Sequence, residues 1–306
     1  MAADWDLVIV GGGVAGLSAG LFARRGGLKT LLVDKQLPGG QLINAAVVKY
    51  FPGFPAGING MELAMSLQEQ CMKHGLKIVA AEAYGLSLAQ PFVVKTTDGS
   101  WTASAVVVAT GAEPRKLEVP GEEELAGRGV SYCASCDGHF FRDQVVAVVG
   151  GGDSALDEAL SLTSVASRVK VIHRRRQLKA CKSLQERALG HDKIEFIWDT
   201  VVERVEGKNA VEGVRLRNRE TGAVQSLSVP GIFVYVGYRP ASDFLAGVLK
   251  TTEDGYVTVS ETMETSVRGI FAAGAVRAGT TGQVITAAAD GAQAALSAEK
   301  LISDSS

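Results

Sequence analysis

The chain is poor in cysteine, nearly balanced in charge and without a long apolar run. Only 4 of its 306 residues are cysteine, too few for a disulfide framework. Its formal net charge of −2 indicates no basic face, so a nucleic-acid partner is not expected. No apolar stretch approaches the roughly 18 residues of a membrane span, so no membrane partner is expected either.

The first apolar segment, Leu7–Val10, lies too near the start of the chain to leave room for a secretory leader. With the low cysteine content, this predicts a cytoplasmic location. A length of 306 residues is enough for roughly two domains of about 150 residues each.

Glycine is abundant, and its 36 copies gather at the ends of apolar segments. Residues 7–10 form such a segment, and the turn Gly11–Gly16, a helical pattern over 17–25 and an apolar run over 28–33 follow it. This succession of strand, tight turn, helix and strand predicts a βαβ unit.

The same succession recurs later in the chain. A strand over 144–149 precedes the turn Gly150–Ala155, a helix over 156–167 and a strand over 169–172. The two units predict an α/β fold with two Rossmann-like nucleotide-binding domains, each of three layers built on βαβ elements.

The spacing of the two turns indicates that one domain is inserted in the other, because their first glycines are 150 − 11 = 139 residues apart. The apolar run 106–112 is expected to be a strand that leaves the first domain. Residues 269–274 and the alanine-rich stretch 286–300 are expected to return to it as a strand and a helix. The expected division is 1–115 with 245–306 for the first domain and 116–244 for the inserted one.

The first glycine-rich turn has the pattern of a dinucleotide site. Gly11 allows the tight turn, Gly13 lets the backbone approach a diphosphate, and Gly16 lets the helix pack close to the strand. Asp34, at the end of the next strand, is placed to hold a ribose hydroxyl. The alternative is a glycine-rich turn without a ligand.

The second turn, with Gly150 and Gly152, is followed by basic residues where the first is followed by an acid. Arg174 and Arg175 come after the next strand, and Lys179 follows shortly. Guanidinium groups suit a phosphate dianion better than a neutral diol, so this pattern favours NADPH over NADH. The alternative is a solvated basic helix start.

Cys133 and Cys136 form the closest pair of cysteines, directly followed by Asp137. Two cysteines at this spacing can close a small disulfide or share a metal. A carboxylate next to them can exchange the proton that thiol–disulfide exchange requires. The pair therefore favours redox chemistry, with a purely structural role as an alternative.

A zinc site is the other alternative for this pair. His139 would supply a third ligand, but the sequence has no second close pair of cysteines, so no metal is expected. Cys71 and Cys181 are interpreted as ordinary small apolar residues.

With both glycine-rich turns, the basic cluster and the Cys-Ala-Ser-Cys-Asp run in this order, the chain resembles the low-molecular-weight thioredoxin reductases over nearly its whole length. The segments that carry the resemblance are Gly39–Gln41, Phe51–Pro55, Ala109–Ala112, Pro114–Arg115, Cys133–Gly138, Gly150–Glu158 and His173–Arg175.

The resemblance implies a flavoprotein disulfide reductase with an FAD domain, an inserted NADPH domain that carries the dithiol, and a homodimer. It implies that electrons pass from NADPH through FAD to the Cys133–Cys136 disulfide, and then to a thioredoxin-like protein disulfide. Cys136 would face the flavin, Cys133 would attack the partner, and Asp137 would be the acid/base. The crossings near Lys116 and Tyr238 would act as hinges.

The residues expected to bind cofactors fall into two sets. In the first domain they are Gly11, Gly13, Ala15, Gly16, Asp34, Gly40, Gln41, Tyr50, Thr110, Gly111, Gly274 and Gln283. In the inserted domain they are Gly150, Gly152, Asp153, Ser154, Arg174, Arg175 and Lys179.

The chain departs from the family mainly at the flavin site. Ala275 stands where the family has an aspartate that holds the ribityl chain, and Gly282 stands where it has an arginine. Lys49-Tyr50 replaces Glu-Asn, and Lys179 replaces an arginine. Each lost hydrogen bond is worth about 0.5–1.5 kcal/mol, so FAD is expected to bind less tightly, unless Tyr50 compensates by stacking on the isoalloxazine.

These departures motivate two alternatives to an NADPH-dependent thioredoxin reductase. One is a related flavoprotein with a different electron donor or disulfide partner. The other is a non-catalytic nucleotide-binding redox sensor.

Overall fold

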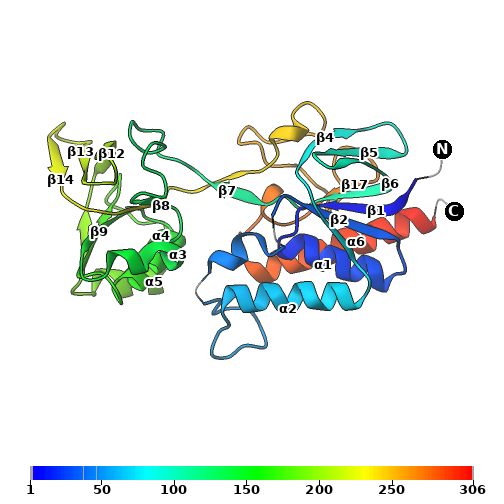
Figure 1. The fold of residues 1–306 in the computed structure, drawn as a ribbon, viewed down its shortest axis with the longest axis horizontal. Helices are drawn as coiled ribbons and strands as arrows, with labels where there is room; N and C mark the ends of the chain where they lie inside the picture. The colour runs from blue at the N-terminus through cyan, green and yellow to red at the C-terminus, as the bar shows by residue number, and fades with distance from the viewer. Residues whose placement is uncertain (1–2, 37, 46, 305–306) are drawn as a thin grey trace. The chain divides into compact units, whose positions relative to one another are not determined.

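The computed structural model describes residues 3–36, 38–45 and 47–304. The chain forms two compact units, each built around its own parallel sheet (Figure 1). The first unit consists of Met1–Glu113 and Arg239–Ser306, and the second of Pro114–Tyr238.

The first unit is centred on a parallel sheet in the order β3-β2-β1-β6, with β17 also paired to β6. Its strands are β1 (Trp5–Val10), β2 (Thr30–Asp34), β3 (Lys77–Ala80), β6 (Gly99–Val108) and β17 (Ile270–Ala272). Most residues of β1, β2 and β17 and of the second half of β6 are apolar and buried, as is typical of a parallel sheet covered on both faces.

Three helices cover one face of this sheet, α1 (Val14–Arg25), α2 (Gly60–Lys73) and α6 (Val284–Ser303), as Figure 1 shows. The antiparallel strands β4 (Ala83–Ser87) and β5 (Phe92–Thr96) extend the sheet from β6. Gly291 allows the close packing of α6 on α1, since a Cβ there would lie 2.0 Å from the Ala15 carbonyl oxygen.

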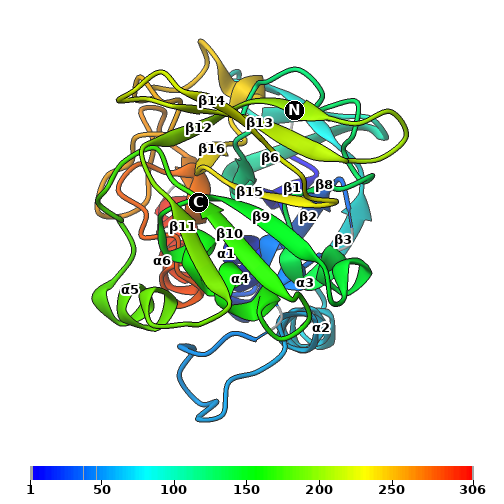
Figure 2. The ribbon, with the colours of Figure 1, turned by 90° about the vertical axis from the view of Figure 1, so that its left-hand side faces the viewer.

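The second unit repeats this plan with a parallel sheet in the order β11-β10-β9-β15-β8. Its strands are β8 (Val130–Ser131), β9 (Val145–Gly150), β10 (Arg168–Ile172), β11 (Ile194–Ile197) and β15 (Ile232–Tyr235). The helices α3 (Ala134–Asp137), α4 (Asp153–Leu162) and α5 (Lys182–Leu189) lie on one face (Figure 2). The other face is covered by an antiparallel sheet of β12 (Thr200–Glu206), β13 (Gly213–Asn218) and β14 (Val224–Leu227).

The elements predicted from periodicity are present, but several of their limits differ, and two of the ends have a visible local cause. The strand expected over 106–112 ends at Val108, and β7 (Ala112–Pro114) begins after a turn in which Gly111 has a φ of +74°. The helix expected to reach residue 167 ends at Leu162. There the Thr163 hydroxyl donates to the Leu160 carbonyl, a local bond that competes with further helix.

The return to the first unit lies at residue 239, six residues before the expected position of 245. The reason is local hydrogen bonding: the Ala241 amide donates to the Gly111 carbonyl at 3.0 Å, and the Thr110 hydroxyl donates to the Ala241 carbonyl at 2.7 Å. The two crossings of the chain pair with each other as β7 and β16 (Tyr238–Pro240).

Within residues 3–36, 38–45 and 47–304, the helices are all too short or too polar to cross a membrane.

Candidate functional site

A cavity of about 740 Å³ opens in the first unit at the carboxyl ends of β1, β2 and β6. This edge of an open parallel sheet is where nucleotides bind. Ten of the expected residues line it: Gly11, Gly13, Ala15, Asp34, Gly40, Gln41, Thr110, Gly111, Gly274 and Gln283.

The glycines of the first turn have the geometry that a dinucleotide site requires. Gly11 has a φ of +106°, and a Cβ there would lie 2.3 Å from the Ala109 carbonyl oxygen. Gly16 does not line the cavity but packs against the strand, since its Cβ would lie 1.8 Å from the Gly11 carbonyl oxygen. A Cβ on Gly13, in contrast, would meet no described atom within 4 Å. Gly13 therefore leaves open space at the start of α1 for a diphosphate.

Asp34 lines the cavity, and both of its carboxylate oxygens accept backbone hydrogen bonds, from the amides of Gly12 and Gln36. These bonds fix the carboxylate at the end of β2. Because each oxygen has further acceptor capacity, the carboxylate can still receive a ribose hydroxyl.

A buried ion pair that the sequence analysis missed supports the far wall of the cavity. Arg277 donates to Asp290 from Nε at 2.6 Å and from Nη2 at 2.8 Å, and Asp290 also accepts the Gly274 amide at 3.1 Å. Asp290 lies on α6, so the pair holds the loop after β17 against that helix. The spacing of the two residues in the sequence carries no signal of this contact.

The departures from the family have a clear structural consequence. Ala275 and Gly282 line the cavity and offer no charged side chain there. Tyr50 does not line it: its side chain is 80% exposed in the loop before α2. The structure of this unit therefore gives no support to stacking of Tyr50 on the isoalloxazine.

The cavity fits a flavin dinucleotide. Its size is within the range of cofactor pockets, it contains the open approach at Gly13, and the N-terminus of the 20-residue helix α6 also borders it at Gln283. At its rim the Glu113 carboxylate accepts from Lys35 Nζ at 3.0 Å. This hydrogen bond lowers the pKa of Glu113 and raises that of Lys35.

The second unit presents a similar turn ahead of α4. Gly150 has a φ of +150°, and a Cβ on Gly152 would meet no described atom within 4 Å. The Asp153 carboxylate accepts the Cys181 amide at 2.7 Å, and the Ser154 hydroxyl is hydrogen-bonded to the Tyr238 hydroxyl. The N-terminus of α4 is therefore open to an anionic ligand. The Ser154 hydroxyl in its first turn is already hydrogen-bonded to Tyr238.

Arg174, Arg175 and Lys179 are exposed near this turn, as a phosphate site requires. Among the described residues, neither Arg174 nor Arg175 forms an ion pair, whereas Arg176 is bonded to Asp199 at 2.6 Å. The first two guanidiniums are thus available for a phosphate dianion.

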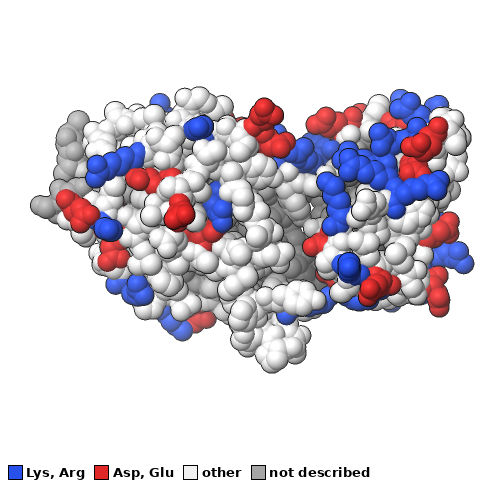
Figure 3. Space-filling model, turned by 180° about the vertical axis from the view of Figure 1, so that it is seen from behind, with Lys and Arg blue, Asp and Glu red and all other residues white. Residues whose placement is uncertain are grey.

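The fold adds a further arginine that sequence reasoning missed. Arg219 Nη1 donates to the Arg174 carbonyl at 3.0 Å, across 45 residues of sequence. Figure 3 shows basic side chains gathered on one part of this unit. The expectation of no basic face was therefore wrong at the local level, because a net charge of −2 does not report how charges are distributed.

Cys133 and Cys136 are joined by a disulfide, with their Cα atoms 5.4 Å apart. Cys133 is half-buried at the start of α3, and Cys136 is exposed. The Cys136 amide donates to Cys133 Sγ at 3.2 Å, and the Ser135 hydroxyl lies 3.3 Å from the same sulfur. Asp137 ends this short helix, so the carboxylate lies next to the pair in sequence.

Two tyrosines fix the dithiol segment, and nothing in the sequence singled them out. Tyr235 Oη accepts the Ala134 amide at 2.8 Å. Burial, followed by the charge of Glu158, raises the pKa of Tyr235, so its hydroxyl stays protonated. Tyr132 Oη donates at 2.8 Å to Glu122, a carboxylate only 1% exposed.

The remaining cysteines differ from each other. Cys71 is buried in α2, and burial raises the pKa of its thiol to about 11, as expected for a small apolar residue. Cys181 is exposed, so its interpretation as an apolar residue was wrong. It is the N-cap residue of α5. Its role there depends on its backbone conformation and not on packing of its side chain.

Comparisons with known proteins agree with this arrangement. A model of the pyridine nucleotide-disulphide oxidoreductase family matches residues 5–291. A thioredoxin reductase of Peptoclostridium litorale is 42% identical over 307 residues, which cover 98% of each chain.

Solved structures give the same result. The thioredoxin reductase of Lactococcus lactis matches with a TM-score of 0.95 at 40% identity, covering 98% of this chain and all of that one. The T. acidophilum enzyme matches with a TM-score of 0.92 at 34% identity, covering 99% of each chain. The chain therefore belongs to the pyridine nucleotide-disulphide oxidoreductase family, as a flavoprotein disulfide reductase that uses FAD and NADPH.

Proposed function

We propose that the chain reduces the disulfide of a thioredoxin at the expense of NADPH. The observation that carries this proposal is the Cys133–Cys136 disulfide, accessible at Cys136 in the unit that also has the open N-terminus of α4. The thioredoxin reductases of similar sequence support the choice of substrate. Because such a dithiol works in a reducing compartment supplied with NADPH, we assign the protein to the cytoplasm.

The two units divide the cofactors between them in this proposal. The cavity of the first unit would hold FAD. The Asp34 carboxylate would accept a ribose hydroxyl, and the backbone at the start of α1 would bind the diphosphate. The start of α4 holds the NADPH diphosphate through Gly152, Asp153 and Ser154. Arg174, Arg175 and Lys179 hold the 2′-phosphate.

The overall reaction balances as NADPH, one proton and a protein disulfide giving NADP⁺ and a protein dithiol. Bound FAD supplies the two-electron relay between the nicotinamide and the Cys133–Cys136 disulfide. The protein's own groups bind the nucleotides, exchange the disulfide and move protons.

Cys133 acts as the thiol that attacks the partner. Its sulfur receives the Cys136 amide and lies next to the Ser135 hydroxyl, and both donors stabilise a thiolate. The Cys133 thiolate forms a mixed disulfide and releases one partner thiolate. The Cys136 thiolate then attacks Cys133, which releases the second. Asp137 is the group that takes and returns the proton.

The partner is a protein rather than a small thiol, because an apolar anchor lies directly after the dithiol helix. The Phe140 side chain is 67% exposed, with its ring centroid 3.9 Å from that of His139. Exposed aromatic rings are the usual anchors of protein interfaces.

The visible spectrum tests the proposed function. The purified protein, reconstituted with FAD, is expected to be yellow and to bleach when NADPH is added without oxygen. Added thioredoxin disulfide should restore the colour. A protein that stays yellow with NADPH but bleaches with another donor would reject NADPH as the donor. A protein that cannot take up FAD would overturn the whole proposal.

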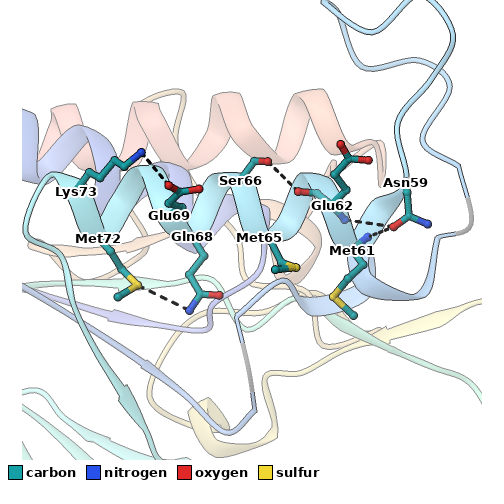
Figure 4. Close-up of a pocket in the computed structure, with 9 residues that line it drawn as sticks. All are labelled: Asn59, Met61, Glu62, Met65, Ser66, Gln68, Glu69, Met72 and Lys73. Carbon is teal, nitrogen blue, oxygen red and sulfur yellow. Dashed lines mark hydrogen bonds and ion pairs between the residues drawn. The ribbon is translucent and has the colours of Figure 1, made fainter.

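We also propose a homodimer, formed through the outer face of α2. Met61, Met65 and Met72 lie on one side of this helix, and Figure 4 shows their side chains pointing away from its Glu69–Lys73 ion pair. They are 46%, 63% and 58% exposed. Methionine side chains are flexible and apolar, so they can pack against the same surface of a second copy. The neighbouring Glu69–Lys73 ion pair is neutral overall, so a two-fold contact would not bring like charges together.

Replacing Met65 with glutamate is expected to weaken this dimer by at least about 10²-fold, because a lone charge would be buried at its centre. Glutamate is a good helix former, so the monomer should keep its fold. Sedimentation velocity measures the change, and Met65→Leu is the matched control that should remain dimeric. A dimeric Met65→Glu protein would exclude this face as the interface.

A further inference from the structure

Arg219 lies in the turn between β13 and β14, but its side chain reaches the basic segment that follows β10. Its Nη1 donates to the Arg174 carbonyl at 3.0 Å. That carbonyl belongs to the peptide bond between Arg174 and Arg175, the two arginines proposed to hold the 2′-phosphate. The direction of this hydrogen bond is fixed, because a guanidinium can only donate and a carbonyl can only accept.

The backbone that carries Arg219 is fixed by local hydrogen bonds. The Asn218 side chain accepts the amides of Glu220 and Thr221 at 3.0 and 2.9 Å, which closes the turn. The Arg219 amide donates to the Asp199 carbonyl at 2.6 Å. Because these bonds form without any ligand, a ligand that uses the Arg219 side chain does not have to order this turn first.

Asp199 also engages the arginine that the sequence places third in the basic cluster. Its buried carboxylate accepts Arg176 Nε at 2.6 Å. The hydrogen bond from Asp199, with a smaller contribution from the charge of Glu220, raises the pKa of Arg176. Arg219, in contrast, forms no ion pair within the described ranges 3–36, 38–45 and 47–304. The fold thus pairs Arg176 with an acid and brings Arg219 to the cluster instead.

We propose that Arg219 binds the 2′-phosphate of NADPH together with Arg174 and Arg175. A guanidinium has five N–H donors, and the bond to the Arg174 carbonyl uses one of them. The Arg219 side chain is exposed, so its other donors can reach a ligand. The inference rests on the proposed NADPH site and adds to it a residue from a distant part of the chain.

A phosphate dianion is the ligand that this arrangement of charges favours. Guanidiniums that lie close together repel one another, and an anion bonded to all of them removes that repulsion. A phosphate monoester carries about −1.5 to −2 charges at pH 7 and has three acceptor oxygens, whereas a ribose diol is neutral. Arg219 is therefore expected to act on the choice between NADPH and NADH and not on nucleotide binding in general.

Titration with NADP⁺ and with NAD⁺ tests the proposal, because the two nucleotides differ only in the 2′-phosphate. Arg219→Ala is expected to weaken NADP⁺ binding by about tenfold or more, the range of a charged hydrogen bond, and to leave NAD⁺ binding within about twofold. Calorimetry on the purified full-length protein measures both affinities. An unchanged NADP⁺ affinity would overturn the proposal. An equal loss for both nucleotides would also overturn it, since Arg219 would then only support the loop.

Two further variants separate contact with the phosphate from support of the loop. Arg219→Gln keeps an amide donor for the Arg174 carbonyl but has no charge, so it should bind NADP⁺ as weakly as Arg219→Ala. Arg219→Lys keeps the charge and should recover part of the loss. Wild-type affinity in Arg219→Gln would reject a direct contact between Arg219 and the phosphate.

Arg217→Ala is the matched control for the loss of a positive charge. Arg217 is exposed two residues earlier, on β13, and its guanidinium is bonded to Glu203 at 2.8 Å. The variant should keep its NADP⁺ affinity within about twofold of wild type, because this charge is already paired. A loss equal to that of Arg219→Ala would mean that only the total charge of the unit matters, and the proposal would fail.

Phosphorus NMR gives an independent readout at the ligand. Hydrogen bonds from guanidiniums stabilise the dianion, so the second pKa of the 2′-phosphate should fall when NADP⁺ binds. It should fall less in Arg219→Ala, and an equal fall would contradict a direct contact. Wild-type protein that binds no NADP⁺ would overturn the proposed NADPH site itself, whereas binding that does not depend on Arg219 would overturn this inference alone.

Discussion

Replacing Cys136 with serine is expected to lower NADPH-driven reduction of a protein disulfide by at least about 10³-fold. One thiol must attack the partner and the other must close the disulfide again, and serine cannot form a sulfur–sulfur bond. The Cys133–Cys136 disulfide in the structure is the oxidised form of the pair in this cycle. Cys133→Ser should fail in the same assay, because the mixed disulfide cannot form.

The loss should be confined to the dithiol step. With ferricyanide, which accepts electrons before the dithiol, NADPH oxidation by Cys136→Ser should stay within about twofold of wild type. Cys181→Ser, at the exposed cysteine outside the pair, is the matched control and should keep full activity. Reduction of a protein disulfide by Cys136→Ser at the wild-type rate would exclude this pair.

A thiol count supports the same assignment. The denatured oxidised protein should show two free thiols, Cys71 and Cys181, and protein reduced by NADPH before denaturation should show four. A count of two after reduction would mean that electrons do not reach the disulfide.

Replacing Arg174 and Arg175 together with alanine is expected to weaken NADPH binding by about 10²- to 10⁴-fold. Each guanidinium–phosphate bond contributes roughly 1.5–3 kcal/mol, and neither side chain is held by an ion pair among the described residues. NADH has no 2′-phosphate, so its binding should change little. The ratio of kcat/KM for NADPH to that for NADH measures the effect.

Arg176 provides the control for this prediction. It lies next to the pair, but its guanidinium is bonded to Asp199. Arg176→Ala should therefore leave the preference for NADPH within about threefold of wild type, since this guanidinium is engaged by Asp199 rather than by a phosphate. If Arg176→Ala loses the preference and the double variant keeps it, the 2′-phosphate site lies elsewhere on this unit.

Much of the candidate site could be predicted from local sequence. Gly11 and Gly150 are followed by helices because positive φ is accessible mainly to glycine, and the strands before them are apolar because they are buried on both faces. The position of Asp34 at the cavity follows from the same βαβ geometry. These features depend on residues within one supersecondary unit, so their spacing is visible along the chain.

The predictions that the structure does not support, or that it shifts, concern features that depend on distant residues. Tyr50 was assigned to the flavin by its place in a motif, but the loop before α2 leaves it exposed. Cys181 was read as apolar, although only the fold decides whether a lone cysteine is covered. The limits of the inserted unit shifted because Ala241 hydrogen-bonds to Thr110 and Gly111, a contact between segments 130 residues apart.

The sequence by itself determined the two nucleotide-binding units, the cysteine pair and the basic residues that we propose select NADPH, because turn conformation, burial pattern and charge are local properties. Only the tertiary structure decided that Asp290 braces Gly274, that Arg219 lies beside Arg174 and that Tyr238 holds Ser154. Such polar pairs form between residues far apart in the chain. A hydrogen bond needs its two groups within about 3 Å, and only the packing of the elements sets that distance.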